Sequence, residues 1–246
     1  MIAVTEVLSR AVHTVRDEQS ALRDECQRFE EFREAVRLAQ PVTTGDVGAS
    51  QTTETLLDTY RETVMAAPDF DEVYGDPLSE HLEHELSPNI SVKFLSKEPF
   101  TQRFKRDLLV ATSAAIERRT RVIQELDGEL ERLRSTRDEL MAIETELAAL
   151  PRCSVDDLPF EEFSRLWEVY EELDQRCREV LDERLQEITG TERRGSGVDN
   201  EHLFNEYLYR ELLTSYPILS AAARIRNRIE DRRGGTPDST TRLTTK

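Results

Sequence analysis

The chain has 246 residues, of which 37% are hydrophobic and 34% are charged, and 50 acidic residues against 33 basic ones give a net charge of −17. This balance suits long amphipathic helices better than one compact globule. The longest apolar run, from Leu108 to Ile116, is far too short to cross a bilayer, which excludes a membrane-spanning helix.

The first predicted element is a helix over residues 4 to 40, which Pro41 closes. Apolar side chains recur in it every seven residues, at Leu8, Val15, Leu22, Phe29 and Val36. This spacing places them on one face of the helix, so residues 1–41 are expected to form an N-terminal coiled-coil helix. Residues 42–54 are rich in Thr, Gly, Ser and Gln, which predicts a flexible linker.

Residues 55–98 are predicted to form a small irregular helical segment, because prolines interrupt their apolar periodicity. A long antiparallel helical hairpin is expected over residues 99–189, with its turn after Pro151. The first arm carries four leucines at strict seven-residue spacing, Leu126, Leu133, Leu140 and Leu147. The second arm carries a seam of its own, made of Phe163, Trp167, Tyr170, Leu173, Cys177 and Val180.

A second linker is predicted at residues 190–199, followed by C-terminal helices over residues 200–233 with a kink or fresh start at Pro217. Residues 234–246 lack apolar content, which predicts a disordered tail. The fold class is therefore all-α: an elongated antiparallel helical bundle or coiled coil with a small irregular helical cap. The oligomeric state stays open, because a heptad seam closes within one chain or between two.

Lysine is nearly absent while arginine is abundant, and the negative charge is spread along the whole chain. At molar salt the Debye length is roughly 3 Å, so an acidic surface stays hydrated without strong self-repulsion. The composition thus indicates a halophilic cytoplasmic protein, although a GC-rich genome also replaces lysine codons by arginine codons. The three cysteines form no C-x-x-C pair, which fits a reducing cytoplasm.

Four segments carry a resemblance to a known family: Val15 to Pro41, Thr63 to Pro77, Phe100 to Arg119 and Tyr207 to Leu219. The middle block TVMAAPDFDEVYGDP and the block YLYRELLTSYPIL are the more distinctive, since any heptad segment resembles another. Together these segments resemble a haloarchaeal coiled-coil family described only as a domain of unknown function. The resemblance implies a haloarchaeal cytoplasmic helical protein and assigns no functional residue.

The candidate metal ligands are His81, His84 and Glu85, which share one predicted helical face. Their order, H-x-x-H-E, matches neither H-E-x-x-H nor its inverted form, so a solvated helix face is the preferred interpretation. The acidic segment from Asp69 to Asp76 suggests a cation loop. Val73 and Tyr74 occupy the fifth and sixth positions, where a calcium loop needs Asp or Asn and then Gly, so cation binding there stays open.

The candidate nucleic-acid contacts are arginines near the C-terminus, where basic residues outnumber acidic ones. They are Arg224, Arg228, Arg232 and Arg233. Cations in the last turns of a helix also complement its dipole without any ligand, and molar salt weakens the counterion release that drives phosphate binding. Nucleic acid is therefore not the expected partner.

No phosphate loop, nucleophile elbow or complete catalytic constellation occurs in the sequence, and no cofactor is implied. We therefore expect a non-enzymatic helical scaffold or adaptor that binds another protein or a second copy of itself. The first alternative is a nucleic-acid-associated regulator that uses the C-terminal arginines. A weaker alternative is a metal-dependent enzyme at the face of His81 and His84.

Overall fold

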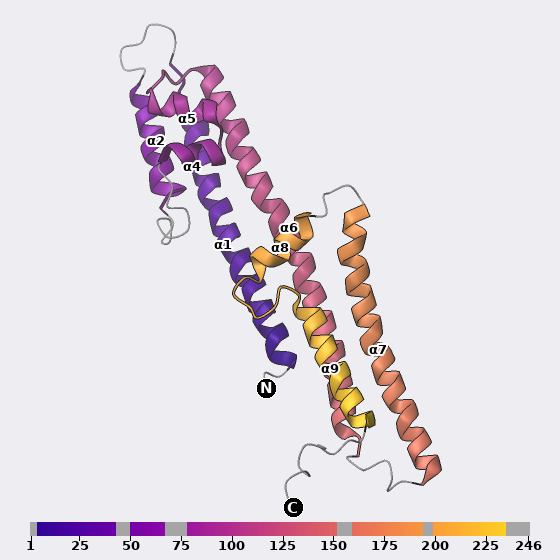
Figure 1. Ribbon diagram of the computed structural model, residues 1–246. Helices are drawn as coiled ribbons and strands as arrows, with labels where there is room; N and C mark the ends of the chain where they lie inside the picture. The colour runs from indigo at the N-terminus through magenta and orange to yellow at the C-terminus, as the bar shows by residue number, and fades with distance from the viewer. Residues whose placement is uncertain (1–3, 43–49, 67–77, 152–158, 194–198, 235–246) are drawn as a thin grey trace, which may run out of the picture. The chain divides into compact units, whose positions relative to one another are not determined.

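The computed structural model describes residues 4–42, 50–66, 78–151, 159–193 and 199–234 (Figure 1). Within these ranges the secondary structure consists of eight helices and no strand, so the predicted all-α class is confirmed. The helices are α1 (Val4–Leu38), α2 (Gln51–Thr63), α4 (Leu78–Glu85), α5 (Pro88–Leu95), α6 (Gln102–Ala149), α7 (Phe160–Arg193), α8 (Asp199–Leu208) and α9 (Pro217–Gly234). In the described part of the chain, none of these helices is long and apolar enough to span a bilayer.

Helix α2 begins inside the range predicted as the first linker. Its first turn is ordered by a tertiary contact, since the buried Thr53 hydroxyl donates a hydrogen bond of 2.6 Å to the carbonyl oxygen of Glu98. Helix α7 likewise runs through Gly190 to Arg193, because one glycine costs a helix only about 1 kcal/mol. The first predicted linker is therefore too long at its C-terminal end, and the second is too long at its N-terminal end.

The chain divides into two compact units, each described by itself below. The core unit comprises residues 18–127, and the hairpin unit comprises residues 1–17 and 128–246. Helices α1 and α6 contribute residues to both units.

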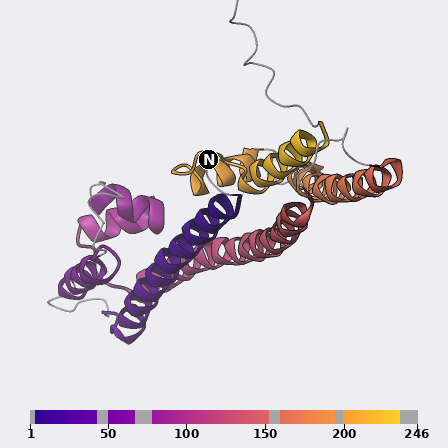
Figure 2. The ribbon, with the colours of Figure 1, turned by 90° about the horizontal axis from the view of Figure 1, so that it is seen from below.

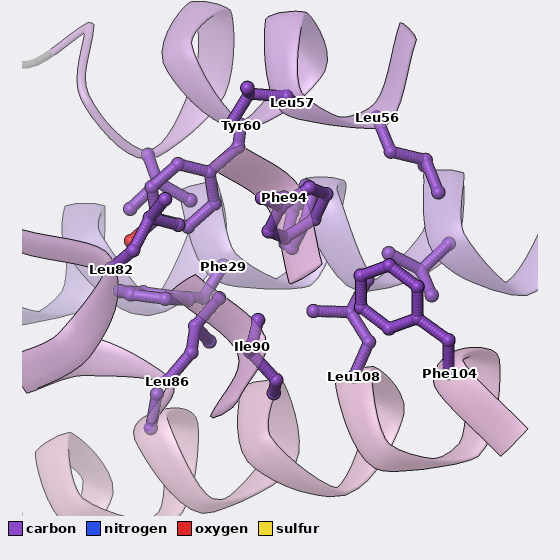
Figure 3. Close-up of a cluster of buried hydrophobic side chains, with 14 of the residues drawn as sticks. Phe29, Leu56, Leu57, Tyr60, Leu82, Leu86, Ile90, Phe94, Phe104 and Leu108 are labelled. Carbon is purple, nitrogen blue, oxygen red and sulfur yellow. The ribbon is translucent and has the colours of Figure 1, made fainter. Parts of the chain in front are cut away.

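The core unit is built around a cluster of buried aromatic and aliphatic side chains that come from each of the five helices described in it (Figure 3). The rings of Phe32 and Tyr60 meet edge to face with their centroids 5.0 Å apart, and those of Phe94 and Phe104 do so at 5.4 Å. Each such side chain contributes roughly 1.5–3 kcal/mol when fully buried. This cluster fixes the short helices α2, α4 and α5, which are too short to be stable alone.

Helix α5 has well-defined ends. Ser87 caps its first turn, with Oγ accepting a hydrogen bond of 3.3 Å from the backbone N–H of Ile90. At the other end the N–H of Glu98 bonds to the carbonyl oxygen of Lys93, and the N–H of Lys97 bonds to that of Phe94. These two bonds form a Schellman motif, with Lys97 in the left-handed region at φ 54°.

The hairpin unit contains the start of α1 as far as Asp17 and α6 from residue 128, together with α7, α8 and α9. Arg176 of α7 pairs with Glu146 of α6 at 3.0 Å, and Arg184 pairs with Glu129 at 3.1 Å, so the two helices run antiparallel. Helix α9 lies alongside α7 (Figures 1 and 2). The side chains buried between these helices include Leu133, Leu140, Leu147, Tyr170, Leu173, Cys177, Val180, Ala222, Ile225 and Ile229.

Candidate protein-interaction surface

Glu129 is the most deeply buried carboxylate of α6, with 1% of its surface exposed. Its carboxylate accepts a hydrogen bond of 2.7 Å from the Tyr209 hydroxyl and pairs with Arg184 and with Arg132 at 2.9 Å. Burial, the charge of Glu129 and the hydrogen bond to it raise the pKa of Tyr209, so the phenol stays protonated and donates. These contacts connect α6, α7 and the turn after α8, so the cluster holds the three segments together.

A second buried carboxylate, Asp174 of α7, holds α9 in place. Arg226 of α9 donates to it from Nε at 2.7 Å, and Arg178 pairs with it from one turn along α7. The hydrogen bond that Arg226 donates to Asp174 raises the pKa of Arg226, against a smaller opposing effect of burial. This pair therefore adds an ionic contact to the apolar packing between α7 and α9.

The arginines predicted to contact nucleic acid lie on α9 and are largely used within the hairpin unit. Arg228 pairs with Glu144, Arg232 donates to the carbonyl oxygen of Leu147, and Arg233 pairs with Glu171 at 2.5 Å. Arg224 is half-buried. The sequence alone did not show that acceptors on α6 and α7 would face three of these four side chains.

The three candidate metal ligands do not converge. His81 is buried with Nδ1 2.9 Å from the Tyr60 hydroxyl, whereas His84 is exposed. The Glu85 carboxylate accepts hydrogen bonds of 2.7 and 2.8 Å from Arg119. Among the residues that the structure describes, no group of three His, Cys, Asp or Glu side chains is placed to hold a metal ion. The segment from Asp69 to Asp76 lies outside them.

Aromatic side chains gather at the start of α7. Phe160 is 81% exposed and Trp167 is 42% exposed, and Phe163 between them is half-buried. Their spacing of three and four residues places them on one helical face. The rings of Phe163 and Trp167 lie 5.8 Å apart between centroids, tilted by 45°. We call Phe160, Phe163 and Trp167 the α7 aromatic surface.

This surface is exposed because its neighbours end first. Arg176 of α7 pairs with Glu146, which lies one turn before the end of α6 at Ala149. Glu171 of α7 pairs with Arg233, which lies next to the end of α9. The first turns of α7 consequently extend beyond the ends of α6 and α9 (Figure 1). The sequence predicted that Phe163 and Trp167 continue the packed seam, but the fully buried part of that seam begins at Tyr170.

The end of α9 meets this surface at one point. The guanidinium of Arg233 lies over the Trp167 ring, 4.2 Å from its centroid, and the same side chain pairs with Glu171 one turn along α7. Exposed carboxylates flank the rest of the surface, at Glu161, Glu162 and Glu168. The α7 aromatic surface thus combines exposed rings with negative charge.

A sequence model of the family described as "Domain of unknown function (DUF7260)" matches residues 6–233, which is most of the chain. No curated protein and no solved structure matches the chain.

Proposed function

This chain belongs to the DUF7260 family, and we propose that it acts as a non-enzymatic helical scaffold or adaptor that binds another protein. The observation that carries the proposal is the α7 aromatic surface. Exposed aromatic side chains that share one face mark interaction sites on soluble proteins, and such residues dominate the binding energy of protein interfaces. Phe160, which leaves 81% of its surface exposed, is the clearest example.

The buried polar groups support the same proposal. Glu129, Asp174 and Arg119 each bond to partners on neighbouring helices of their own unit. Paired groups of this kind hold helices together, whereas a catalytic group needs a free side facing its substrate. We do not extend the proposal to nucleic acid, because the arginines of α9 are largely engaged with acceptors on α6 and α7.

We further propose that the protein works in the cytoplasm of a halophilic archaeon. The net charge of −17 and the preference for arginine over lysine support this setting. An acidic surface keeps a protein soluble at molar salt, where self-repulsion is screened.

The adaptor proposal is tested by affinity capture of the tagged full-length chain from a lysate of its host at undiluted cellular salt. Proteins and nucleic acids in the eluate are both identified, and a Phe160→Ser variant is captured in parallel. We expect a stoichiometric protein partner that the wild type retains and the Phe160→Ser variant loses. Recovery of nucleic acid without a protein partner would instead support the regulator, and recovery of neither would reject the adaptor.

A further inference from the structure

The hairpin unit already binds one basic amphipathic helix, which is its own α9. The apolar face of α9 packs inward through Ile225 and Ile229, while arginines beside that face reach acceptors on α6 and α7. Arg226 and Arg233 show the two contacts that α7 offers, namely a buried carboxylate and an aromatic ring with a carboxylate one turn away.

The chemistry that receives α9 continues along α7 past the last residue of α9, Gly234. The next turns towards the start of α7 present the rings of Trp167, Phe163 and Phe160. Residues 160–172 contain five glutamates and one arginine, which gives a local net charge of −4. The glutamates are Glu161, Glu162, Glu168, Glu171 and Glu172, and the arginine is Arg165. Rings and carboxylates in this combination favour arginine-bearing partners.

A second copy of the chain is a poor match for this surface. Two copies that met through it would bring two segments that each carry a net charge of −4 into direct contact. Like charges placed opposite each other at an interface oppose association, and salt screens them less there than on an open surface. A partner of opposite charge removes this repulsion and gains ion pairs.

We propose that the α7 aromatic surface binds a basic amphipathic helix of another protein, laid along α7 as a continuation of α9. The inference rests on the proposed adaptor function and names the chemistry of its partner. Apolar side chains of the partner helix cover Phe160 and Phe163, and its arginines pair with Glu161, Glu162 or Glu168.

Trp167 reports on this surface directly, because it is the only tryptophan in the chain. Its fluorescence is recorded while the full-length protein is titrated with a synthetic amphipathic helix of about 18 residues, or five turns, made of leucine and arginine. One control peptide keeps the leucines and replaces every arginine by glutamate. A second control peptide keeps the composition and scrambles the order, so that no apolar face forms.

The matched variants are Phe160→Ser and Leu213→Ser. Both side chains are 81% exposed and belong to the hairpin unit, so neither substitution threatens the core, but only Phe160 lies on the α7 aromatic surface. We expect saturable binding of the arginine peptide, at least a fivefold rise of Kd for Phe160→Ser, and an unchanged Kd for Leu213→Ser. Neither control peptide should bind.

Several results would overturn the inference. Equal binding of the glutamate peptide would show that charge has no part in recognition, and an unchanged Kd for Phe160→Ser would place the site elsewhere. Light scattering that shows a dimer lost in Phe160→Ser would assign the surface to a second copy. A shift of Trp167 emission on deletion of residues 235–246 would assign it to the end of this chain.

The failure of this inference differs from the failure of the adaptor proposal. A captured protein partner that Phe160→Ser still retains would leave the adaptor intact and remove only the α7 aromatic surface. The absence of any captured protein would remove the adaptor itself, whatever the peptide does.

Discussion

Arg119 of α6 donates two hydrogen bonds to the carboxylate of Glu85 of α4, at 2.7 Å from Nη2 and 2.8 Å from Nη1. Its Nε donates at the same time to Glu25 of α1 at 2.6 Å, and its guanidinium lies 4.5 Å from the centroid of the Phe29 ring. Burial opposes the charge on Arg119, but hydrogen bonds and charges from the two glutamates outweigh it and raise the pKa of Arg119. One side chain thus ties three helices of the core unit together.

Replacement of Arg119 by methionine should destabilise the core unit strongly. The substitution preserves most of the packing but leaves Glu85 and Glu25 without the guanidinium at a largely buried site. Removing one partner of a buried ion pair costs about 3–5 kcal/mol. The loss is measured by denaturant unfolding. The control is Arg118→Met, since Arg118 lies half-exposed beside the same glutamate and a surface pair contributes at most about 1 kcal/mol. Equal losses for the two variants would contradict this assignment.

Glu85 should make the stability of the core unit depend on pH. Burial favours its neutral form, but the hydrogen bonds and charge of Arg119, with help from His81 and Arg118, lower the pKa of Glu85 below its ordinary value of 4.5. A lowered pKa means that the folded state binds this proton less readily than the unfolded state does. The stabilisation is therefore complete above pH 4.5 and disappears as the pH falls through the folded pKa.

The measurement is the free energy of unfolding of the wild type and Glu85→Gln from pH 7 to pH 3. The difference in free energy of unfolding between the wild type and Glu85→Gln should shrink as the pH falls below 4.5, so the two curves converge. Glu83→Gln, on the exposed face of the same helix, is the control and should run parallel to the wild type. A constant difference between wild type and Glu85→Gln would show that the carboxylate charge does not matter.

The heptad leucines show what the sequence could predict. Leu133, Leu140 and Leu147 are buried as expected, because seven-residue spacing alone places them on one face of a helix. Trp167 was expected in a packed seam and is 42% exposed, because its exposure depends on where α6 and α9 end. That register is a tertiary property, which periodicity within α7 does not encode.

The candidate site illustrates the same limit. The spacing of His81 and Glu85 correctly places them on one helical face. Their hydrogen-bond partners come from other helices, however: His81 bonds to Tyr60 and Glu85 bonds to Arg119, so the two side chains do not form one site. The buried carboxylates of Glu129 and Asp174 were missed, since an acidic residue within a charged helix carries no local sign of burial. The phenylalanines and tryptophan flanked by glutamates at the start of α7 were the one signal available in the sequence.

Glycine at position 97 should stabilise the core unit more than alanine does. Lys97 adopts a left-handed conformation at φ 54° at the end of α5, which costs a residue with a Cβ atom and costs glycine almost nothing. Its side chain also pairs with Glu54 at 2.6 Å, so any substitution loses that exposed contact. The informative comparison is therefore Lys97→Gly against Lys97→Ala, which differ only in the backbone effect.

We expect the unfolding equilibrium constant of Lys97→Gly to be lower than that of Lys97→Ala by roughly fivefold. Thermal or denaturant unfolding of the two variants supplies the comparison. Equal stability of the two would mean that the Schellman motif is not strained at this position.

Cys177 should resist thiol reagents in the folded protein. Burial, followed by the negative charge of Asp174, raises the pKa of this thiol to about 11, so little thiolate forms at pH 8. Burial also raises the pKa of Cys26, which is only partly covered. Iodoacetamide labelling with peptide mapping should therefore modify Cys177 more slowly than Cys26, and both should react fully in denaturant. Rapid labelling of Cys177 in folded protein would show that α7 and α9 separate readily.

Salt should control the folding of the whole chain. With a net charge of −17, self-repulsion acts over a Debye length of about 10 Å at 0.1 M salt but only about 3 Å at 1 M. We expect the helical circular dichroism signal to be strongest at molar salt and to weaken as the salt concentration is lowered to about 0.1 M. Sucrose at low salt is the control, because it favours compact states without screening charge. It should restore less helicity than potassium chloride does. A spectrum independent of salt would indicate that the arginine preference reflects a GC-rich genome, because the ion pairs and apolar seams would then outweigh the repulsion without help from the solvent.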